Sequence, residues 1–463
     1  MDSTQSHSKL KFSIKRTNFR NMDLVNSNRR DFIKGIGAVT AATALGTGFL
    51  LKACSPGQRR ATAPTFLDQA PEGQVLKAGL IGCGSRGTGA AINFLDAGPG
   101  LEITALGDVF ADRLNGCRAE LKAQRNVEVA DEKCFLGFDS YQKVIDSGVD
   151  VVLLVTPPFF RPAQFEAAVR AKKHVFMEKP VAVDPFGVRI MRAASRMADG
   201  LGLKVVAGTQ RRHQRDYLTT YEQIKNGAIG DIIAANCYWN QPQLWFVNRQ
   251  PGWNDMEAML RDWVNWTWLS GDHIVEQHIH NYDVVSWFKG KHPVKALSFG
   301  ARLRRPTGDQ YDFFSTDFVY DDGTHLHSMC RQINNSSNLI SEHIVGTKGT
   351  SNCQNSIKTH AGEPMWDYVY PPDEEGNPSM QLMKNPFEQE MVHLVAAIRN
   401  NTPLNQADDC AMSSLVGIMG RISAYTGKEV TMEEMLNSNM RIGPEILAFG
   451  DVNIPKLVQI PGV

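Results

Sequence analysis

The segment GDHIVEQHIHNYDVVSW, residues 271–287, holds three histidines and three carboxylates within seventeen positions. Such a density of titratable groups suggests either a metal site or a site of proton transfer. On a helix, five side chains spaced by three or four residues would form one stripe: Asp272, Glu276, His280, Asp283 and Trp287. His278 would point about 200° away from His280, and no cysteine lies in the segment. The spacing therefore predicts proton transfer and no metal.

A histidine in such a stripe suits the oxidation of an alcohol. This reaction releases a hydride and a proton, and a side chain with a pKa of about 6.5 accepts protons well near neutral pH. We expect His280 to be the base, Glu276 to orient the substrate or the imidazole, and Lys179 to stabilise the developing alkoxide. A structural histidine is the alternative for His280, and it is the preferred interpretation for His273 and His278.

A glycine-rich loop could bind the oxidant. In GLIGCGSRG, three glycines follow an apolar run and precede a helical stretch, where they allow a tight turn and close approach of a pyrophosphate. Asp108 closes the next apolar run, where a carboxylate would bind an adenosine ribose and disfavour a 2′-phosphate. The pattern predicts NAD, with NADP less favoured; a purely structural turn is the alternative. The loop residues expected to contact the cofactor are Gly82, Gly84, Ser85, Arg86 and Gly87.

The elements that would position these residues alternate regularly. Five apolar runs between residues 75 and 210 are separated by mostly helical stretches: VLKAGLIGCG, LEITALGDV, VDVVLLVTPP, KHVFMEKPV and LKVVAGTQ. This predicts an α/β fold with a doubly wound parallel sheet. Glu178, Lys179 and Pro180 end the fourth run, or the fifth strand if a short one near Phe135 is counted. Ligands bind at such carboxyl ends, and Pro180 could follow a cis peptide bond.

The pattern changes after about residue 230. Longer apolar runs joined by turns predict a C-terminal α+β domain with an open, largely antiparallel sheet, and the helical stretch PFEQEMVHLVAAIRNN should pack back on the body. We divide the chain into an export signal at 1–53, a linker at 54–73, an NAD-binding Rossmann domain at 74–208 and a substrate-binding domain at 209–463.

Together, these motifs resemble the Gfo/Idh/MocA family of sugar and cyclitol oxidoreductases, such as glucose–fructose oxidoreductase and inositol dehydrogenase. The resemblance covers roughly residues 75–435 and rests on GLIGCGSRG, GDVFADR, VTPP, HVFMEKPVAVD, GTQRRHQRDY and the segment 271–287. It implies that Lys179 binds the substrate hydroxyl near the nicotinamide. The family's D-x-x-x-H motif, with Asp three residues later, falls on Glu276, His280 and Asp283, so that Glu276 replaces the usual aspartate.

The same resemblance implies further contacts. Arg161 stands where many members carry a histidine, so both Arg161 and Asp283 are candidates for substrate binding. The expected cofactor contacts beyond the glycine loop are Thr156, Pro157, Glu178, Lys179 and Gln210. Seven of the eight tryptophans lie between residues 239 and 287. Because tryptophan offers a flat apolar face to a pyranose ring, we expect Trp245 and Trp253 to line the sugar site; an aromatic core is the alternative.

The N-terminal residues predict export. NRRDFIK followed by GIGAVTAATALGTGFLL resembles a twin-arginine signal, and LKAC places Cys54 where a lipoprotein would be lipidated. We therefore expect the protein to be exported to the periplasm, where a lipid on Cys54 could anchor it to the membrane. Lys+Arg and Asp+Glu number 49 each, which gives no support for a nucleic-acid partner. The eight cysteines form no C-x-x-C pair, which predicts free thiols.

Export limits the supply of fresh cofactor, so we expect NAD to stay bound. The leading hypothesis is oxidation or reduction of a ring hydroxyl, at C3, of a sugar or glycoside, giving or consuming a keto sugar. The alternative is an NAD-dependent glycosidase that works by transient C3 oxidation and elimination, since the chain also resembles such enzymes. A non-catalytic sugar-binding lipoprotein is a third hypothesis. The open sheet suggests a homo-oligomer.

Overall fold

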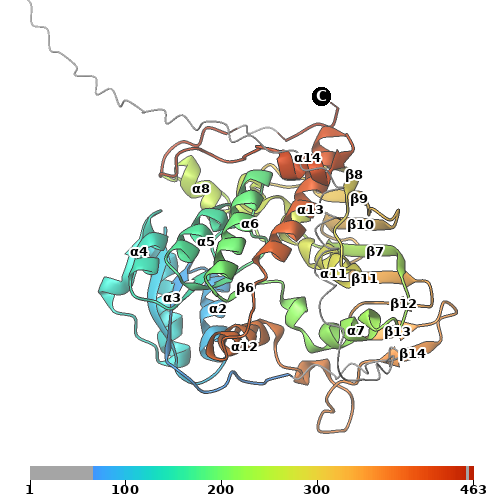
Figure 1. The fold of residues 1–463 in the computed structure, drawn as a ribbon. Coiled ribbons are helices and arrows are strands. Elements are labelled where there is room, and N and C mark those ends of the chain that lie inside the picture. Colours follow the sequence, from blue (N-terminus) through green and yellow to red (C-terminus); the bar gives the residue numbers. More distant parts are fainter. Residues whose placement is uncertain (1–65, 455–457, 463) are drawn as a thin grey trace, which may run out of the picture. The chain divides into compact units, whose positions relative to one another are not determined.

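The computed structural model describes residues 66–454 and 458–462, which belong to one compact unit. The predicted export signal, Cys54 and the linker up to residue 65 lie outside the described residues. Two sheets lie side by side within this unit, and helices fill the space between and around them (Figure 1).

The first sheet has six parallel strands in the order β3-β2-β1-β4-β5-β6. Its central strands are buried on both faces because helices cover both, which explains their continuous apolar runs. The strands are β1 (Leu76–Ile81), β2 (Leu101–Asp108), β3 (Cys134–Leu136), β4 (Val151–Leu154), β5 (His174–Met177) and β6 (Val205–Ala207). The covering helices are α2 (Ser85–Leu95), α3 (Ala111–Arg125), α4 (Ser140–Asp146), α5 (Arg161–Arg170) and α6 (Pro185–Gly200). The predicted doubly wound sheet is confirmed.

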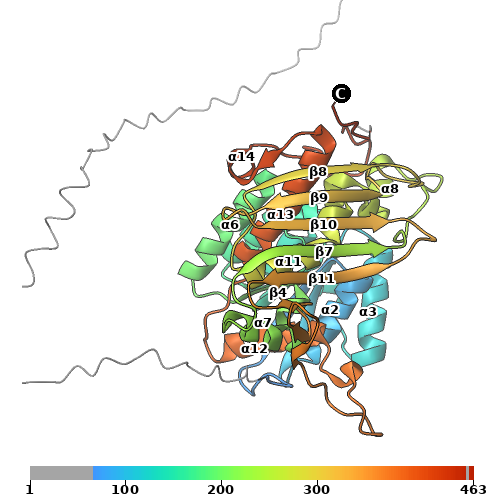
Figure 2. The same ribbon diagram turned by 90° about the vertical axis from the view of Figure 1, so that its right-hand side faces the viewer.

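The second sheet has nine strands in the order β14-β13-β12-β11-β7-β10-β9-β8-β15, and only the β7–β10 pair is parallel (Figure 2). The largely antiparallel prediction is therefore confirmed. The longer strands are β7 (Ile232–Gln241), β8 (Lys295–Ala301), β9 (Phe313–Val319), β10 (His325–Gln332) and β11 (Leu339–Gly346). The short ones are β12 (Thr350–Ser351), β13 (Ser356–Lys358), β14 (Pro364–Asp367) and β15 (Val430–Thr431).

Burial alternates along the strands of this second sheet, as in the pattern of β10. Helices α11 (Ile279–Lys289) and α13 (Ala407–Thr426) pack on the buried face. The opposite face, which is turned toward the viewer in Figure 2, carries the exposed alternate residues of β8, Leu297 and Phe299. Within the described residues, helices therefore cover one face of this sheet and leave much of the other face exposed.

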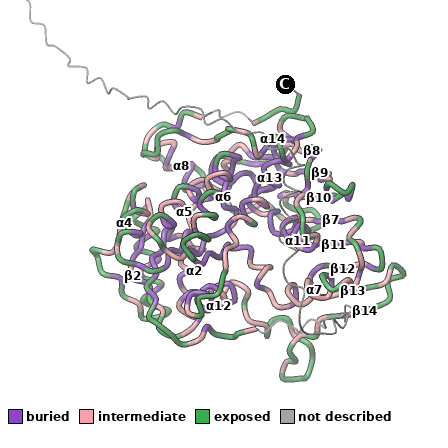
Figure 3. The backbone as a smooth tube through the Cα atoms, in the orientation of Figure 1, coloured by how far each residue is buried: buried purple, intermediate pink, exposed green. Residues whose placement is uncertain are grey.

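The remaining helices connect the two sheets. As predicted, the late helix returns to the body: α12 (Pro386–Arg399) packs on α2 and β6, while α13 packs on α6 and β8. Buried residues accordingly gather along α13 and in the strands (Figure 3). The other helices are α7 (Arg215–Lys225), α8 (Asp255–Arg261), α9 (Thr267–Ser270), α10 (His273–Glu276) and α14 (Met432–Asn437), with 3-10 turns at η2 (Pro158–Phe160), η3 (Gln210–His213) and η4 (Trp263–Asn265). Within the described ranges, no helix combines the length and apolar character needed to cross a membrane.

The prediction of one continuous helical stripe over residues 272–287 is wrong. The helix breaks between α10 and α11, because the His278 amide bonds to the His273 carbonyl and the His280 amide to the Gln277 carbonyl. These are spacings of five and three residues, so the rotation of the chain changes at the break. Asp272 precedes α10 with a φ of 71° and caps it by accepting from the His273 amide. The side chains of the segment therefore point in several directions.

Candidate functional site

The glycine loop between β1 and α2 has the shape of a phosphate cradle. Gly82 has a φ of 95°, and a Cβ on Gly87 would lie 1.8 Å from the Gly82 carbonyl oxygen, so neither tolerates a side chain. A Cβ on Gly84 would meet nothing within 4 Å. Helix α2 begins at Ser85, so its first amides point toward this open space. The loop fits the pyrophosphate of a dinucleotide.

Asp108 lies beside this loop at the end of β2. Its carboxylate accepts from the Cys83 amide at 2.7 Å and from the Phe110 amide at 2.9 Å. Burial raises the pKa of Asp108, although these bonds oppose the shift. Farther along the same edge of the sheet, Thr156 after β4 donates to Gln164, and after β6 the buried Gln210 side-chain oxygen has no hydrogen-bond partner within the described residues. An unpartnered acceptor at this edge fits a bound polar ligand.

Lys179 follows β5 and reaches into the break between α10 and α11. Its ammonium donates to the Glu276 carboxylate at 2.9 Å and to the Glu276 carbonyl at 2.6 Å. Both side chains are nearly buried, at 10% and 7% exposed. The second Glu276 carboxylate oxygen accepts from Gln277. As predicted from Pro180, the Lys179–Pro180 peptide is cis.

His280 lies in the first turn of α11, four residues after Glu276, where the charge of Lys179 acts on its ring. Its ring stacks on Trp239 of β7, with 5.3 Å between ring centroids, and its buried Nδ1 lacks a hydrogen-bond partner in the described part of the chain. Burial, followed by the charges of Lys179, Arg211 and His278, holds the pKa of His280 well below its ordinary value. His280 is therefore neutral at neutral pH, and its ring can accept a proton. The structure thus brings Lys179, Glu276 and His280 together.

The other two histidines of the segment, His273 and His278, bond to protein side chains inside the molecule. His278 bonds to Ser328 at 2.6 Å, and His273 bonds to the Asp272 carboxylate at 2.9 Å. Burial lowers the pKa of both rings. In the described parts of the chain, no group of three or more His, Cys, Asp or Glu side chains could hold a metal ion.

Glu178 and Arg86 form a partly buried ionic cluster next to the glycine loop. Arg86 pairs with Glu178 and, at 3.2 Å, with Glu390 of α12. Burial raises the pKa of Glu178, but the charges of Arg86 and Lys179 outweigh it and give a net lowering. Burial also raises the pKa of Glu390 well above its usual value. The cluster ties α12 to the predicted cofactor loop.

Arg161 is buried beneath the strand ends. Its guanidinium donates to the carbonyls of Thr156 and Pro180, and burial lowers its pKa to about 10. It therefore links the two loops that follow β4 and β5. Asp283 likewise bonds to protein groups: Arg212 donates to it at 2.9 and 3.0 Å and Ser413 at 2.6 Å. Arg161 and Asp283, both predicted to bind substrate, thus have polar groups that bond to other segments of the chain.

Two residues at the site were not foreseen. Trp239 was not singled out among the tryptophans, although its alternation with the buried Cys237 places it on the inner face of β7. Arg211 of η3 lies over the Trp239 ring at 5.6 Å and pairs with the buried Glu342. No sequence signal indicates the Arg211–Glu342 pair, since the two residues are 131 positions apart.

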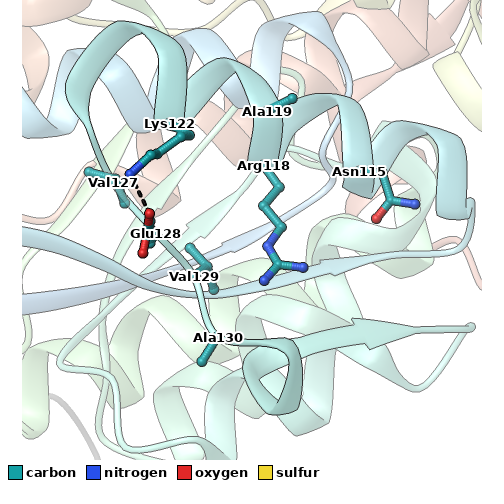
Figure 4. Close-up of a pocket in the computed structure, with 8 residues that line it drawn as sticks. All are labelled: Asn115, Arg118, Ala119, Lys122, Val127, Glu128, Val129 and Ala130. Atoms are coloured by element: carbon teal, nitrogen blue, oxygen red, sulfur yellow. Dashed lines mark hydrogen bonds and ion pairs between the residues drawn. The ribbon is translucent and has the colours of Figure 1, made fainter.

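The predicted sugar-binding tryptophans lie on a loop before α8. Trp245 is 47% exposed, with its ring 6.1 Å from that of Trp263. The Trp253 ring lies 5.0 Å from the guanidinium of Arg261. A surface hollow of about 550 Å³ lies elsewhere, between α3 and residues 127–130 (Figure 4). None of the predicted site residues lines that hollow.

Comparison with known families matches three parts of the chain. Residues 76–208 match a model described as "Oxidoreductase family, NAD-binding Rossmann fold", and residues 217–352 match "GFO/IDH/MocA C-terminal domain". Residues 26–46 match a twin-arginine translocation signal, so export by that route is supported.

Individual relatives agree with these matches. The scyllo-inositol 2-dehydrogenase (NAD(+)) of Bacillus subtilis is 23% identical over 77% of this chain and 96% of its own length. The scyllo-inositol dehydrogenase of Lactobacillus casei, solved with NAD(H) and scyllo-inositol, has a TM-score of 0.56 at 22% identity, covering 77% of this chain and 99% of its own. The aldose–aldose oxidoreductase of Caulobacter crescentus, solved with glycerol, has a TM-score of 0.58 at 19% identity with the same coverage. At these identities the structural likeness concerns the fold.

Proposed function

Because the chain belongs to the Gfo/Idh/MocA family of oxidoreductases, we propose that it is an NAD-dependent enzyme acting on a ring hydroxyl, at C3, of a sugar or glycoside. The observation that carries the proposal is the meeting of Lys179, Glu276 and His280 beside the carboxyl ends of the parallel strands. Relatives named for inositol and aldoses act on polyhydroxylated compounds, which agrees with a substrate of this chemical class.

The cofactor would lie along the carboxyl edge of the six-stranded sheet. Asp108 favours NAD over NADP, because a carboxylate there repels a 2′-phosphate. NAD, when bound, supplies the hydride acceptor. The residues proposed to hold it are Gly82, Gly84, Ser85, Arg86, Gly87, Asp108, Thr156, Pro157, Glu178, Lys179 and Gln210.

The proton chemistry follows from two side chains. Lys179 carries three N–H donors, of which two go to Glu276, so one is left for the substrate oxygen. This donor stabilises the alkoxide that forms as hydride leaves. The neutral imidazole of His280 takes the hydroxyl proton. Glu276 acts as a positioning residue, and Trp239 offers a face to the sugar ring.

Export favours retention of the cofactor. A protein carried out by the twin-arginine route leaves folded, so NAD bound in the cytoplasm would travel with it to the periplasm, where Cys54 would provide a lipid anchor. Each cycle must then restore NAD. A second sugar can do this by accepting hydride, or the enzyme can oxidise C3, eliminate the aglycone, add water and reduce C3 again. The second route makes net glycoside hydrolysis the alternative function.

The test uses protein purified after export, with no NAD added. A denatured extract is assayed for NAD, and the protein is incubated with methyl and p-nitrophenyl glycosides, alone and with 3-keto-glycosides. Keto sugar formed in repeated turnovers supports the proposal, while released aglycone without keto product supports hydrolysis. Lys179→Met and His280→Gln should abolish either reaction. A protein that binds NAD but turns over none of these compounds would support the third hypothesis, a sugar-binding protein.

The exposed face of the nine-stranded sheet suggests a homo-oligomer. Leu297 and Phe299 present apolar area there, which a second copy could bury. Light scattering should give a dimer or larger assembly, and Phe299→Asp should reduce its mass. A monomer at micromolar concentration would contradict this.

A further inference from the structure

The turn that follows β2 is held from two sides. On one side, the Asp108 carboxylate bonds to the amides of Cys83 in the glycine loop and Phe110 in the turn. The turn therefore moves together with the glycine loop. On the other side, Phe110 faces residues that come from outside the six-stranded sheet and its helices.

Arg261, at the end of α8, makes the main contacts from that side. Its guanidinium lies 4.0 Å from the Phe110 ring centroid and forms two bonds of 3.1 Å with the carboxylate of Asp112, in the first turn of α3. Trp253 packs against the same guanidinium at 5.0 Å, and Glu257 accepts from its Nε at 3.0 Å. The orientation of Arg261 is thus fixed by four groups.

The C-terminal segment adds a second contact. The Phe449 ring lies 5.9 Å from that of Phe110 and 5.3 Å from that of Phe138, which follows β3. The Gly450 carbonyl accepts from the Met256 amide of α8 at 3.0 Å. In Figure 1 this red segment runs from α14 across to α8. Segments far apart in the sequence therefore meet over the turn.

We propose that Arg261 and Phe449 form a clasp that holds the Asp108–Phe110 turn closed and slows the release of NAD. The inference rests on the proposed use of NAD, and it supplies a means for the cofactor to stay bound after export. A dinucleotide held between the glycine loop and this turn leaves only when the turn moves, and the clasp must open for that movement. Arg261 and Phe449 are positioning residues, since they act through Phe110 and Asp112.

The test measures the rate of NADH release. Purified protein is loaded with NADH and mixed with excess NAD, and the fall in NADH fluorescence gives the dissociation rate. Arg261→Ala should speed release about tenfold, since one cation–π contact and one exposed ion pair together correspond to roughly one power of ten. Phe449→Ala should act in the same direction. Asp112→Asn removes the ion pair but keeps the ring contact, so it should have a smaller effect.

Arg125→Ala is the matched control. Arg125 ends the same helix α3 and also forms two bonds with an aspartate, Asp96, but it lies at the opposite end from the turn. Its removal should leave the release rate unchanged. Thermal unfolding without NADH checks that each variant is folded. Equal rates in wild type, Arg261→Ala and Asp112→Asn would overturn the clasp while leaving the proposed function intact. Failure of the wild type to bind NADH would overturn both.

Discussion

Replacing Arg211 by glutamine tests whether positive charge keeps His280 neutral. The pKa of His280 is lowered by burial first, and then by Lys179, Arg211 and His278. Lys179 cannot be changed for this purpose, because it is proposed to contact the substrate. Arg211 contacts the Trp239 ring on which His280 stacks, so it can be altered without removing a reacting group.

The size of the effect follows from the stacking distances. The Arg211 guanidinium lies 5.6 Å from the Trp239 ring centroid, and the His280 ring lies 5.3 Å from it, so the two cations would be at most about 11 Å apart. At an effective dielectric constant of about 20, unit charges at that distance repel by about 1.5 kcal/mol, or about one pKa unit. Removing a positive charge favours the protonated ring. Arg211→Gln should therefore raise the pKa of His280 by about one unit.

The assay is an NMR titration of protein labelled in its histidine rings. The His280 signal is assigned by its loss in His280→Gln, and the acid limb of kcat/KM should shift upward with it once a substrate is known. Arg211→Lys keeps the charge and serves as the control, with a pKa near that of wild type. An unchanged or lower pKa in Arg211→Gln, or an equal rise in Arg211→Lys, would refute the electrostatic reasoning.

Three further predictions concern single positions. Gly84→Ala should leave the melting temperature unchanged, because a Cβ there meets nothing within 4 Å. The added methyl group should occupy the space for the phosphates, so calorimetry should show NAD binding weakened roughly tenfold. A lower melting temperature would contradict the open space at Gly84. Glu276→Asp should withdraw the carboxylate that lies 2.9 Å from Lys179 and lower kcat/KM about tenfold to a hundredfold; unchanged kinetics would argue against a positioning role. Burial lowers the pKa of His213 to about 3 and that of His393 to about 4, so the stability they confer is present above about pH 6.5 and declines as pH falls toward these values. Between pH 6.5 and pH 5, urea unfolding should show His393→Gln losing about 1.5 kcal/mol less stability than wild type does, and equal losses would refute the linkage.

The sequence by itself determined the parallel sheet and its glycine loop. The apolar runs that became β1, β2, β4, β5 and β6 are local signals, and a strand buried on both faces must be apolar throughout. The loop glycines are local signals too, since a positive φ and a close backbone approach exclude other residues. The position of Lys179 at a strand end followed from the same runs.

Only the tertiary structure decided which side chains meet at Lys179. Glu276 lies 97 positions away, and its carbonyl is free to accept from the ammonium because at the break after α10 the His280 amide bonds to Gln277 instead. The spacing of the segment did not reveal this break. Asp283 fits the same predicted stripe but pairs with Arg212, while Trp239 reaches His280 from another strand. Local sequence sets the backbone conformation of each element. Contacts between elements depend on how the two sheets and their helices pack, and that packing is a property of the whole chain.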